Sequence, residues 1–168
     1  GKVNKALLIG GLDYGDDDGT SVVQSFRSLS GSEEEVSLAQ QALDQGAWSS
    51  KVIKGKDATR LNTLQVLKEN SHKVVHFSTH GYVFNRSIGL AHADESLRNR
   101  IATSYNGLIR SGLVLSGANR YWLGDPADGE SGILSAYDIA NIRLDHLDLV
   151  ILSSCQSGIG QIHSEEGV

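Results

Sequence analysis

The stretch VVHFSTHG, residues 74–81, decides the fold. Its apolar run has the length of a strand, stops abruptly at polar residues and ends with His80 and a glycine. A second stretch, LVILSSCQSG at residues 149–158, has the same pattern and ends near Cys155, the only cysteine in the chain. Strands that are buried on both faces read as continuous apolar runs, which is typical of parallel sheets. Both stretches are therefore predicted to be buried parallel strands.

Other strand patterns precede these two stretches and alternate with helices. Short apolar runs at residues 5–9 and 51–54 predict two strands, and the first of them ends at Gly10 and Gly11. Alternation of strands and helices along a chain is typical of parallel sheets with helical crossovers. The sequence therefore predicts an α/β fold with a mostly parallel central sheet.

Two helices are expected between these strands. Ser32 before three glutamates predicts an N-cap with acids in the first turn, and Gly46 ends that helix. Asp57 or Thr59 opens the second helix, in which one apolar stripe is expected to contain Leu61, Leu64 and Leu67. The long stretch before the last strand is predicted to contain a polar loop at 85–106, a strand at 111–117, a loop at 124–132, a helix at 134–142 and the last strand at 147–153.

Composition excludes several classes of protein. The 168 residues carry a formal net charge of −5, and the fifteen Lys and Arg residues are scattered, which argues against a nucleic-acid groove. No apolar stretch approaches the roughly 20 residues that a membrane helix needs, and no secretion signal is recognisable. A single cysteine cannot form an internal disulfide, which fits a reducing cytoplasm. We therefore expect a single cytoplasmic domain without nucleic-acid or membrane contacts.

His80 and Cys155 are predicted to meet at the carboxyl ends of neighbouring strands, where sites form in open α/β sheets. Neighbouring strands lie about 5 Å apart, which brings an imidazole within reach of a thiol. A histidine can take the proton of a thiol whose unperturbed pKa is about 8.5. The backbone N–H groups of Gly81 and Cys155 are then candidate donors to the oxyanion of an acyl-transfer intermediate. The alternative is structural, because a lone buried cysteine is usually a small apolar residue and a histidine can simply satisfy a strand end.

These motifs resemble a known family. HFSTHG and DLVILSSCQSG resemble the histidine and cysteine motifs of caspase-like cysteine peptidases, and they are most similar to those of the CHAT domain. The resemblance extends through SGLVLSGA, GILSAYDI, the segments GSEEEVSLAQQAL and GKDATRLNTLQ, and the final EEGV, so it covers nearly the whole chain in order. It implies a caspase-like three-layer α/β/α sandwich and hydrolysis of peptide bonds, with Cys155 as nucleophile and His80 as general base and acid.

The resemblance also implies a substrate pocket and partners. The positions that line the primary specificity pocket in caspase-like enzymes correspond to Asp13 or its neighbours and to Ser153. An acid at Asp13 favours a basic substrate side chain. Residues 1–168 resemble the larger caspase subunit, so we expect a C-terminal segment or a processed small subunit to cover the exposed edge of the last strand. TPR repeats or a regulatory partner are further expectations, and bacterial relatives cut protein substrates such as gasdermins in defence.

No cofactor or metal is predicted. The glycines after the first strand lack the spacing of a dinucleotide-binding fingerprint. The acidic run Asp16–Asp18 does not match a calcium loop, so a solvated loop is favoured over looser calcium binding. His76 and His80 lie about 13 Å apart along a strand, too far for one metal, so His76 is expected to pack or hydrogen-bond beneath the site. Two functions stay open: a regulated cysteine endopeptidase, and a non-catalytic scaffold that binds peptides or partners.

Overall fold

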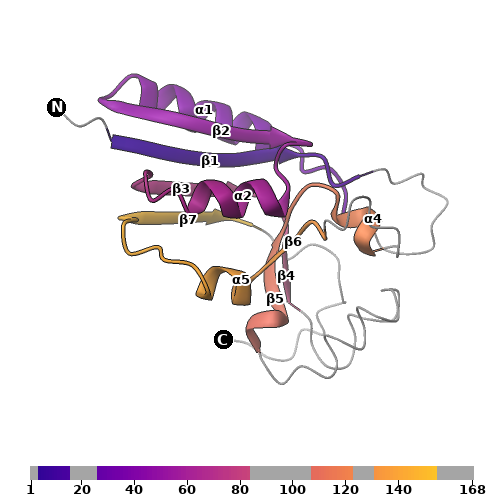
Figure 1. Cartoon of the computed structure of the whole chain (residues 1–168). Helices are drawn as coiled ribbons and strands as arrows, with labels where there is room; N and C mark the ends of the chain where they lie inside the picture. The colour runs from indigo at the N-terminus through magenta and orange to yellow at the C-terminus, as the bar shows by residue number, and fades with distance from the viewer. Residues whose placement is uncertain (1–3, 16–25, 84–106, 123–130, 155–168) are drawn as a thin grey trace, which may run out of the picture.

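The computed structural model describes residues 4–15, 26–83, 107–122 and 131–154. Within these ranges four strands form a parallel sheet in the order β2-β1-β3-β7 (Figure 1). This arrangement confirms the predicted α/β class with a mostly parallel central sheet. The strands are β1 (Asn4–Leu12), β2 (Trp48–Gly55), β3 (Val74–Ser78) and β7 (Leu149–Ser153).

Helices cover both faces of this sheet and make the three layers. Helix α1 (Ser32–Asp44) lies on the face that carries His76, because a carboxylate from α1 bonds to that side chain. Helices α2 (Arg60–Leu67) and α5 (Ala136–Ala140) lie on the other face, where their apolar side chains border one cavity together with Phe77. Successive side chains of a strand point to opposite faces, which assigns the two helical layers (Figure 1).

A second sheet lies beyond the carboxyl ends of the parallel strands (Figure 1). Its antiparallel strands, in the order β4-β5-β6, are β4 (Gly81–Val83), β5 (Ser111–Val114) and β6 (Ile133–Ser135). Two short helices accompany it, η1 (Gly107–Ile109) and α4 (Ala118–Trp122). The prediction of one helix over 134–142 is wrong at its start, because those residues first complete β6. Ser135 then caps α5, and its hydroxyl accepts from the Asp138 N–H at 3.1 Å.

The first strand is longer than predicted because its two glycines remain in the sheet. β1 runs through Gly10 and Gly11 to Leu12 instead of ending there. A Cβ on Gly10 would lie only 2.4 Å from the Val36 side chain of α1. Gly10 is therefore the position at which the helix packs directly on the strand.

The start of α1 also differs from the prediction. Gly31, and not Ser32, is the N-cap, and its left-handed φ of 90° suits a glycine. The Ser32 hydroxyl instead accepts from the Gly11 N–H at 2.9 Å and donates to the Ser78 carbonyl at 2.6 Å. Ser32 thus connects β1 with β3 and leaves the helix end to the glycine. At α2 the prediction of Thr59 as the cap is confirmed, since its side chain accepts from the Asn62 N–H.

One predicted apolar stripe is only partly buried. Leu64 and Leu67 of α2 are buried, but Leu61 is 62% exposed. The buried face of α2 also includes Thr63 and Val66. The prediction of a helix from this three-residue spacing is therefore confirmed. Its buried face is shifted by about one position, away from Leu61 and toward Thr63 and Val66.

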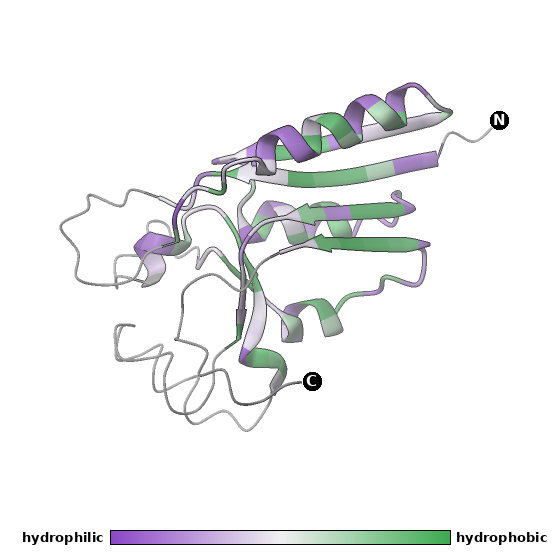
Figure 2. Cartoon of the chain, turned by 180° about the vertical axis from the view of Figure 1, so that it is seen from behind, coloured by the Kyte–Doolittle hydropathy of each residue, from purple (hydrophilic) through white to green (hydrophobic). Residues whose placement is uncertain are grey.

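The prediction that the last strand is buried on both faces is wrong for the described structure. All four apolar residues of β7 are exposed, by 40% to 58% (Leu149, Val150, Ile151 and Leu152). The reason is its place at the edge, where β3 is its single neighbour in the described sheet. Figure 2 shows β7 as an apolar strand on the outer side of the sheet. Within the described ranges, this strand has the exposed edge that the sequence predicts.

Candidate active site

His80 is held in a defined orientation directly after β3. Its side chain is only 4% exposed, and its Nε2 lies 2.6 Å from the backbone carbonyl oxygen of Arg27. A carbonyl can only accept, so Nε2 carries the hydrogen and donates it. In the neutral ring, Nδ1 is then the nitrogen that accepts a proton. This tautomer is the one a general base needs if the nucleophile approaches Nδ1.

Two aromatic rings fix the plane of this imidazole. The ring centroids of Tyr14 and Phe26 lie 4.9 Å and 5.8 Å from that of His80. The Tyr14 hydroxyl lies 2.8 Å from the Thr79 hydroxyl, which itself donates to the Val114 carbonyl. Burial raises the pKa of Tyr14 above its usual value, so the phenol stays protonated and donates to Thr79. No motif in the sequence indicates these supporting groups.

The ends of β3 and β7 are joined up to the residue before Cys155. Ser78 pairs with Ser153 in the parallel ladder, and the Thr79 N–H donates to the Ser153 carbonyl at 3.2 Å. Ser154 continues toward β4, where a Cβ placed on Gly81 would lie 3.4 Å from its hydroxyl oxygen. Cys155 lies outside the described residues. The described residues thus bring His80, Gly81 and Ser153 to one end of adjacent strands. The role of Cys155 as nucleophile and the roles of Gly81 and Cys155 as oxyanion donors stay predictions.

Asp13 lies one strand farther along the same sheet edge. It follows β1, and its carboxylate accepts from the Gly15 N–H at 3.0 Å, within a turn. The Gly117 N–H donates to the Asp13 carbonyl, which links this turn to the segment before α4. The next residue, Tyr14, contacts the His80 ring. Asp13 is therefore near the candidate site through its neighbour, and its predicted contact with a substrate stays a prediction.

The prediction that His76 packs or hydrogen-bonds beneath the strand end is confirmed. It is buried beneath the strand end, and its Nε2 donates to the Glu35 carboxylate at 3.1 Å. The helix pattern predicts Glu35 only as an acid of the first helical turn. Strand parity is the signal for its further contacts, because His76 and Ser78 share one face and present two polar groups to the helix above them.

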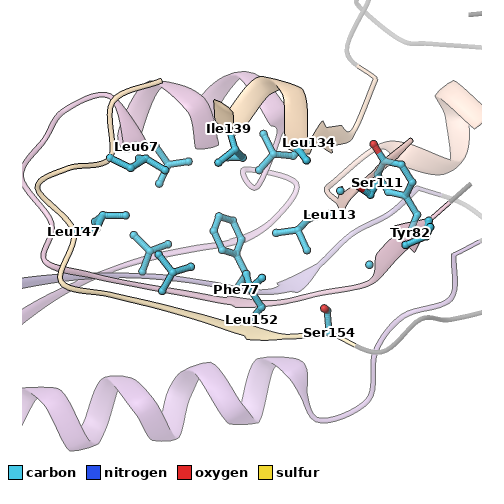
Figure 3. A pocket seen from close by; sticks show the side chains of 17 residues that line it. Leu67, Phe77, Tyr82, Ser111, Leu113, Leu134, Ile139, Leu147, Leu152 and Ser154 are labelled. Carbon is cyan, nitrogen blue, oxygen red and sulfur yellow. The ribbon is translucent and has the colours of Figure 1, made fainter. Parts of the chain in front are cut away.

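An apolar cavity of about 510 Å³ lies on the opposite face of the sheet (Figure 3). Strands β3 and β7 contribute Phe77 and Leu152 to its floor, and α5 contributes Ile139. Gly81 and Ser154 border the cavity, so it reaches the junction described above. Its lining suits an apolar group and offers few hydrogen-bond partners.

The described ranges contain neither a metal centre nor a membrane helix. No three His, Cys, Asp or Glu side chains in them come together as metal ligands would. Among the same residues, every helix is too short or too polar to cross a bilayer. The acidic residues considered for calcium, Asp16–Asp18, lie outside the described part of the chain.

The comparison with protein families agrees with this architecture. A family model described as the CHAT domain matches residues 2–168. A search of curated proteins gave no match. The CHAT domain is related to the caspase-like cysteine peptidases, whose mixed α/β architecture is consistent with the parallel sheet and its flanking helices. Because the match spans nearly the whole sequence, the chain belongs to the CHAT domain family.

Proposed function

We propose that this CHAT domain is a cysteine endopeptidase in which Cys155 is the nucleophile and His80 is the general base and acid. One observation carries the proposal: the oriented His80 imidazole follows a strand whose neighbour leads, through Ser153 and Ser154, directly to the only cysteine. A buried imidazole with two aromatic neighbours and a fixed Nε2–H is more ordered than a strand end requires.

The proposed reaction has two halves, acylation of Cys155 and hydrolysis of the acyl-enzyme. The Cys155 thiol gives its proton to His80 Nδ1, and the thiolate attacks the scissile carbonyl carbon. The N–H groups of Gly81 and Cys155 stabilise the resulting oxyanion. The imidazolium, supported by the Arg27 carbonyl at Nε2, donates its proton to the leaving amine. Water then gives a proton to His80 and its hydroxyl to the acyl carbon. The bond from that carbon to the Cys155 sulfur breaks, the acid leaves, and the sulfur takes the proton back from His80.

The substrate in this proposal is a protein segment, cut in the cytoplasm. Asp13 and Ser153 border the pocket for the residue before the cut, and the Asp13 carboxylate favours a basic side chain there. Defence-type substrates such as gasdermin-like proteins fit this proposal, because caspase-like relatives in bacteria act on them. Control by TPR repeats or another regulatory partner belongs to the same proposal.

The exposed edge of β7 favours the proposal that this domain has a partner. Val150 and Leu152 line the adjoining cavity, and Leu149 and Ile151 expose apolar surface on the opposite face of the strand. We propose that a further strand, from a following segment or a processed small subunit, pairs with β7 and covers this area. Pairing would satisfy the side of the strand that no described residue pairs with, and it would remove an aggregation-prone edge.

A thiol-reactive probe tests the proposed nucleophile. In the full chain, Cys155 should react with iodoacetamide about tenfold or more faster than a free cysteine peptide at pH 6.5, because a histidine holds part of it as thiolate. His80→Ala should remove this advantage, and Cys155→Ala should remove labelling altogether. His146→Ala, at the amino end of the strands, is the matched control and should leave the rate unchanged. A peptide library then reports cleavage and the preferred side chain.

The same experiment separates the two function classes. Slow labelling that His80→Ala does not change would contradict the endopeptidase and favour the non-catalytic scaffold. Preference for an acidic residue before the cut would contradict only the role of Asp13.

A further inference from the structure

Helix α4 brings a buried amide side chain close to the residues that surround His80. The helix lies beyond the carboxyl end of β1 (Figure 1), and the backbone N–H of its residue Asn119 donates to the Tyr14 carbonyl at 2.9 Å. The Asn119 residue is only 1% exposed. Burial of a polar side chain is costly unless its hydrogen bonds are satisfied. The partners of the Asn119 side chain therefore show what this residue holds in place.

The Asn119 amide forms hydrogen bonds to two separate segments of the chain. Its Oδ1 accepts from the Phe26 N–H at 2.8 Å, and its Nδ2 donates to the Phe26 carbonyl at 3.0 Å. The same Nδ2 also donates to the Gly15 carbonyl at 3.1 Å. A backbone N–H can only donate, so the contact with Phe26 fixes which atom of the amide is the oxygen. One buried side chain thus joins the segment after β1 to the segment before α1.

Both of these segments contact the His80 imidazole. The first supplies the Tyr14 ring and the second supplies the Phe26 ring, with centroids 4.9 Å and 5.8 Å from that of His80. The carbonyl that accepts from His80 Nε2 belongs to Arg27, the residue directly after Phe26. The groups that set the plane and the tautomer of the imidazole are therefore next to, or part of, the residues that Asn119 binds.

We propose that Asn119 is a positioning residue for the His80 imidazole. It holds the two flanking rings and the Arg27 carbonyl at fixed places around the ring, so that Nε2 keeps its hydrogen and Nδ1 stays available to the thiol. This inference rests on the proposed function, and it assigns Asn119 no contact with the substrate or the reacting atoms.

An asparagine suits this role because its amide carries an acceptor and two donor hydrogens in one plane. The N–H and the carbonyl of Phe26 require one group of each kind, and the Gly15 carbonyl requires a second donor. Aspartate at this position keeps the acceptor but has no donor when ionised, and alanine has neither. Either substitution removes bonds to the Phe26 backbone, so the Phe26 ring and the Arg27 carbonyl are expected to shift relative to His80.

The first test measures the rate at which iodoacetamide labels Cys155 in the full chain at pH 6.5. Asn119→Ala should slow labelling by about tenfold, the size expected when a buried hydrogen bond that orients the base is lost. Ser116→Ala is the matched control. Ser116 is 4% exposed in the segment before α4, and its hydroxyl donates to the Gly55 carbonyl of β2 at 2.5 Å. This variant also loses a buried hydrogen bond, but it should keep the parent labelling rate.

Nitrogen NMR of the His80 ring supplies a second readout that does not depend on catalysis. At a pH where the ring is neutral, the parent should show one tautomer, with the hydrogen on Nε2. In Asn119→Ala, the tautomer with the hydrogen on Nδ1 should reach at least about a tenth of the population, because the Arg27 carbonyl is no longer held against Nε2. Ser116→Ala should show the parent spectrum.

Four outcomes decide the inference. If Asn119→Ala keeps the parent tautomer and labelling rate while His80→Ala still suppresses labelling, the inference is wrong and the proposed function stands. Equal slowing by Ser116→Ala would show a general loss of stability and would also contradict the inference. If His80→Ala changes nothing in the parent, the proposed function fails and the inference fails with it. If Asn119→Ala does not fold, Asn119→Asp, which keeps the size of the side chain, decides by the same criteria.

Discussion

Strands β3 and β7 are neighbours with similar sequences and opposite environments. VVHFS and LVILS pair residue for residue in one parallel ladder. Phe77 of β3 is 4% exposed, whereas its direct partner Leu152 of β7 is 58% exposed. An apolar run therefore indicates a strand but does not fix how deeply that strand is buried.

The difference comes from the place of each strand in the sheet. β3 lies between β1 and β7, with α1 on one face and α2 on the other, so it has neighbours in every direction. β7 has β3 on one side, and within the described residues nothing covers its other side. As a result, His80 follows a buried strand, whereas an exposed strand leads to Cys155. On β3, the carboxylate of Glu35 accepts hydrogen bonds from His76 and Ser78.

The largest effect is expected from truncating the paired residues Phe77 and Leu152. Phe77→Ala should lower the free energy of unfolding by about 3 kcal/mol, because a buried ring is replaced by a larger cavity. Leu152→Ala is the matched control and should cost at most about 1 kcal/mol, since its side chain is already exposed. Urea unfolding of both variants measures the difference. Equal losses would show that β7 is as buried as β3 in solution.

An intermediate effect is expected from pH at Glu35, whose carboxylate accepts hydrogen bonds from His76 and Ser78. The folded-state pKa of Glu35 lies below its ordinary value of 4.5, so the folded protein binds fewer protons there than the unfolded chain. The stabilisation is complete above pH 4.5 and is lost as pH falls through the folded pKa. It amounts to about 1 kcal/mol or less, because solvent screens a part-exposed carboxylate. Unfolding curves for the parent and Glu35→Gln should therefore differ at pH 7 and converge toward pH 3; a constant gap would contradict this.

The smallest effect is expected on the exposed strand itself. Ile151→Thr keeps the β-branched shape and should change the free energy of unfolding by no more than about 0.5 kcal/mol, as is usual for exposed positions. It should also reduce self-association at high concentration, which light scattering measures. A loss above about 2 kcal/mol would show that this side chain is covered in solution.

The sequence predicted the elements of the parallel sheet better than their surroundings. The runs at residues 74–81 and 149–158 identified two strands and placed a histidine after one of them, because apolar runs between polar ends are local signals. The Arg27 carbonyl could not be predicted, since every residue has a carbonyl and the loop before α1 has no periodicity. Tyr14, Phe26 and Glu35 were missed for a related reason: their contacts with His80 and Ser78 join segments far apart in sequence.

The sequence by itself determined the fold class, the CHAT family and the candidate residues His80, Gly81 and Ser153, because strand patterns and motifs are encoded in consecutive residues. Only the tertiary structure decided which strand is buried, which nitrogen of His80 carries the hydrogen and which carboxylate accepts from Ser78. Burial, tautomer and ionisation depend on neighbours brought together by folding. Those neighbours are set by the order of strands in the sheet and by the helices packed on its faces.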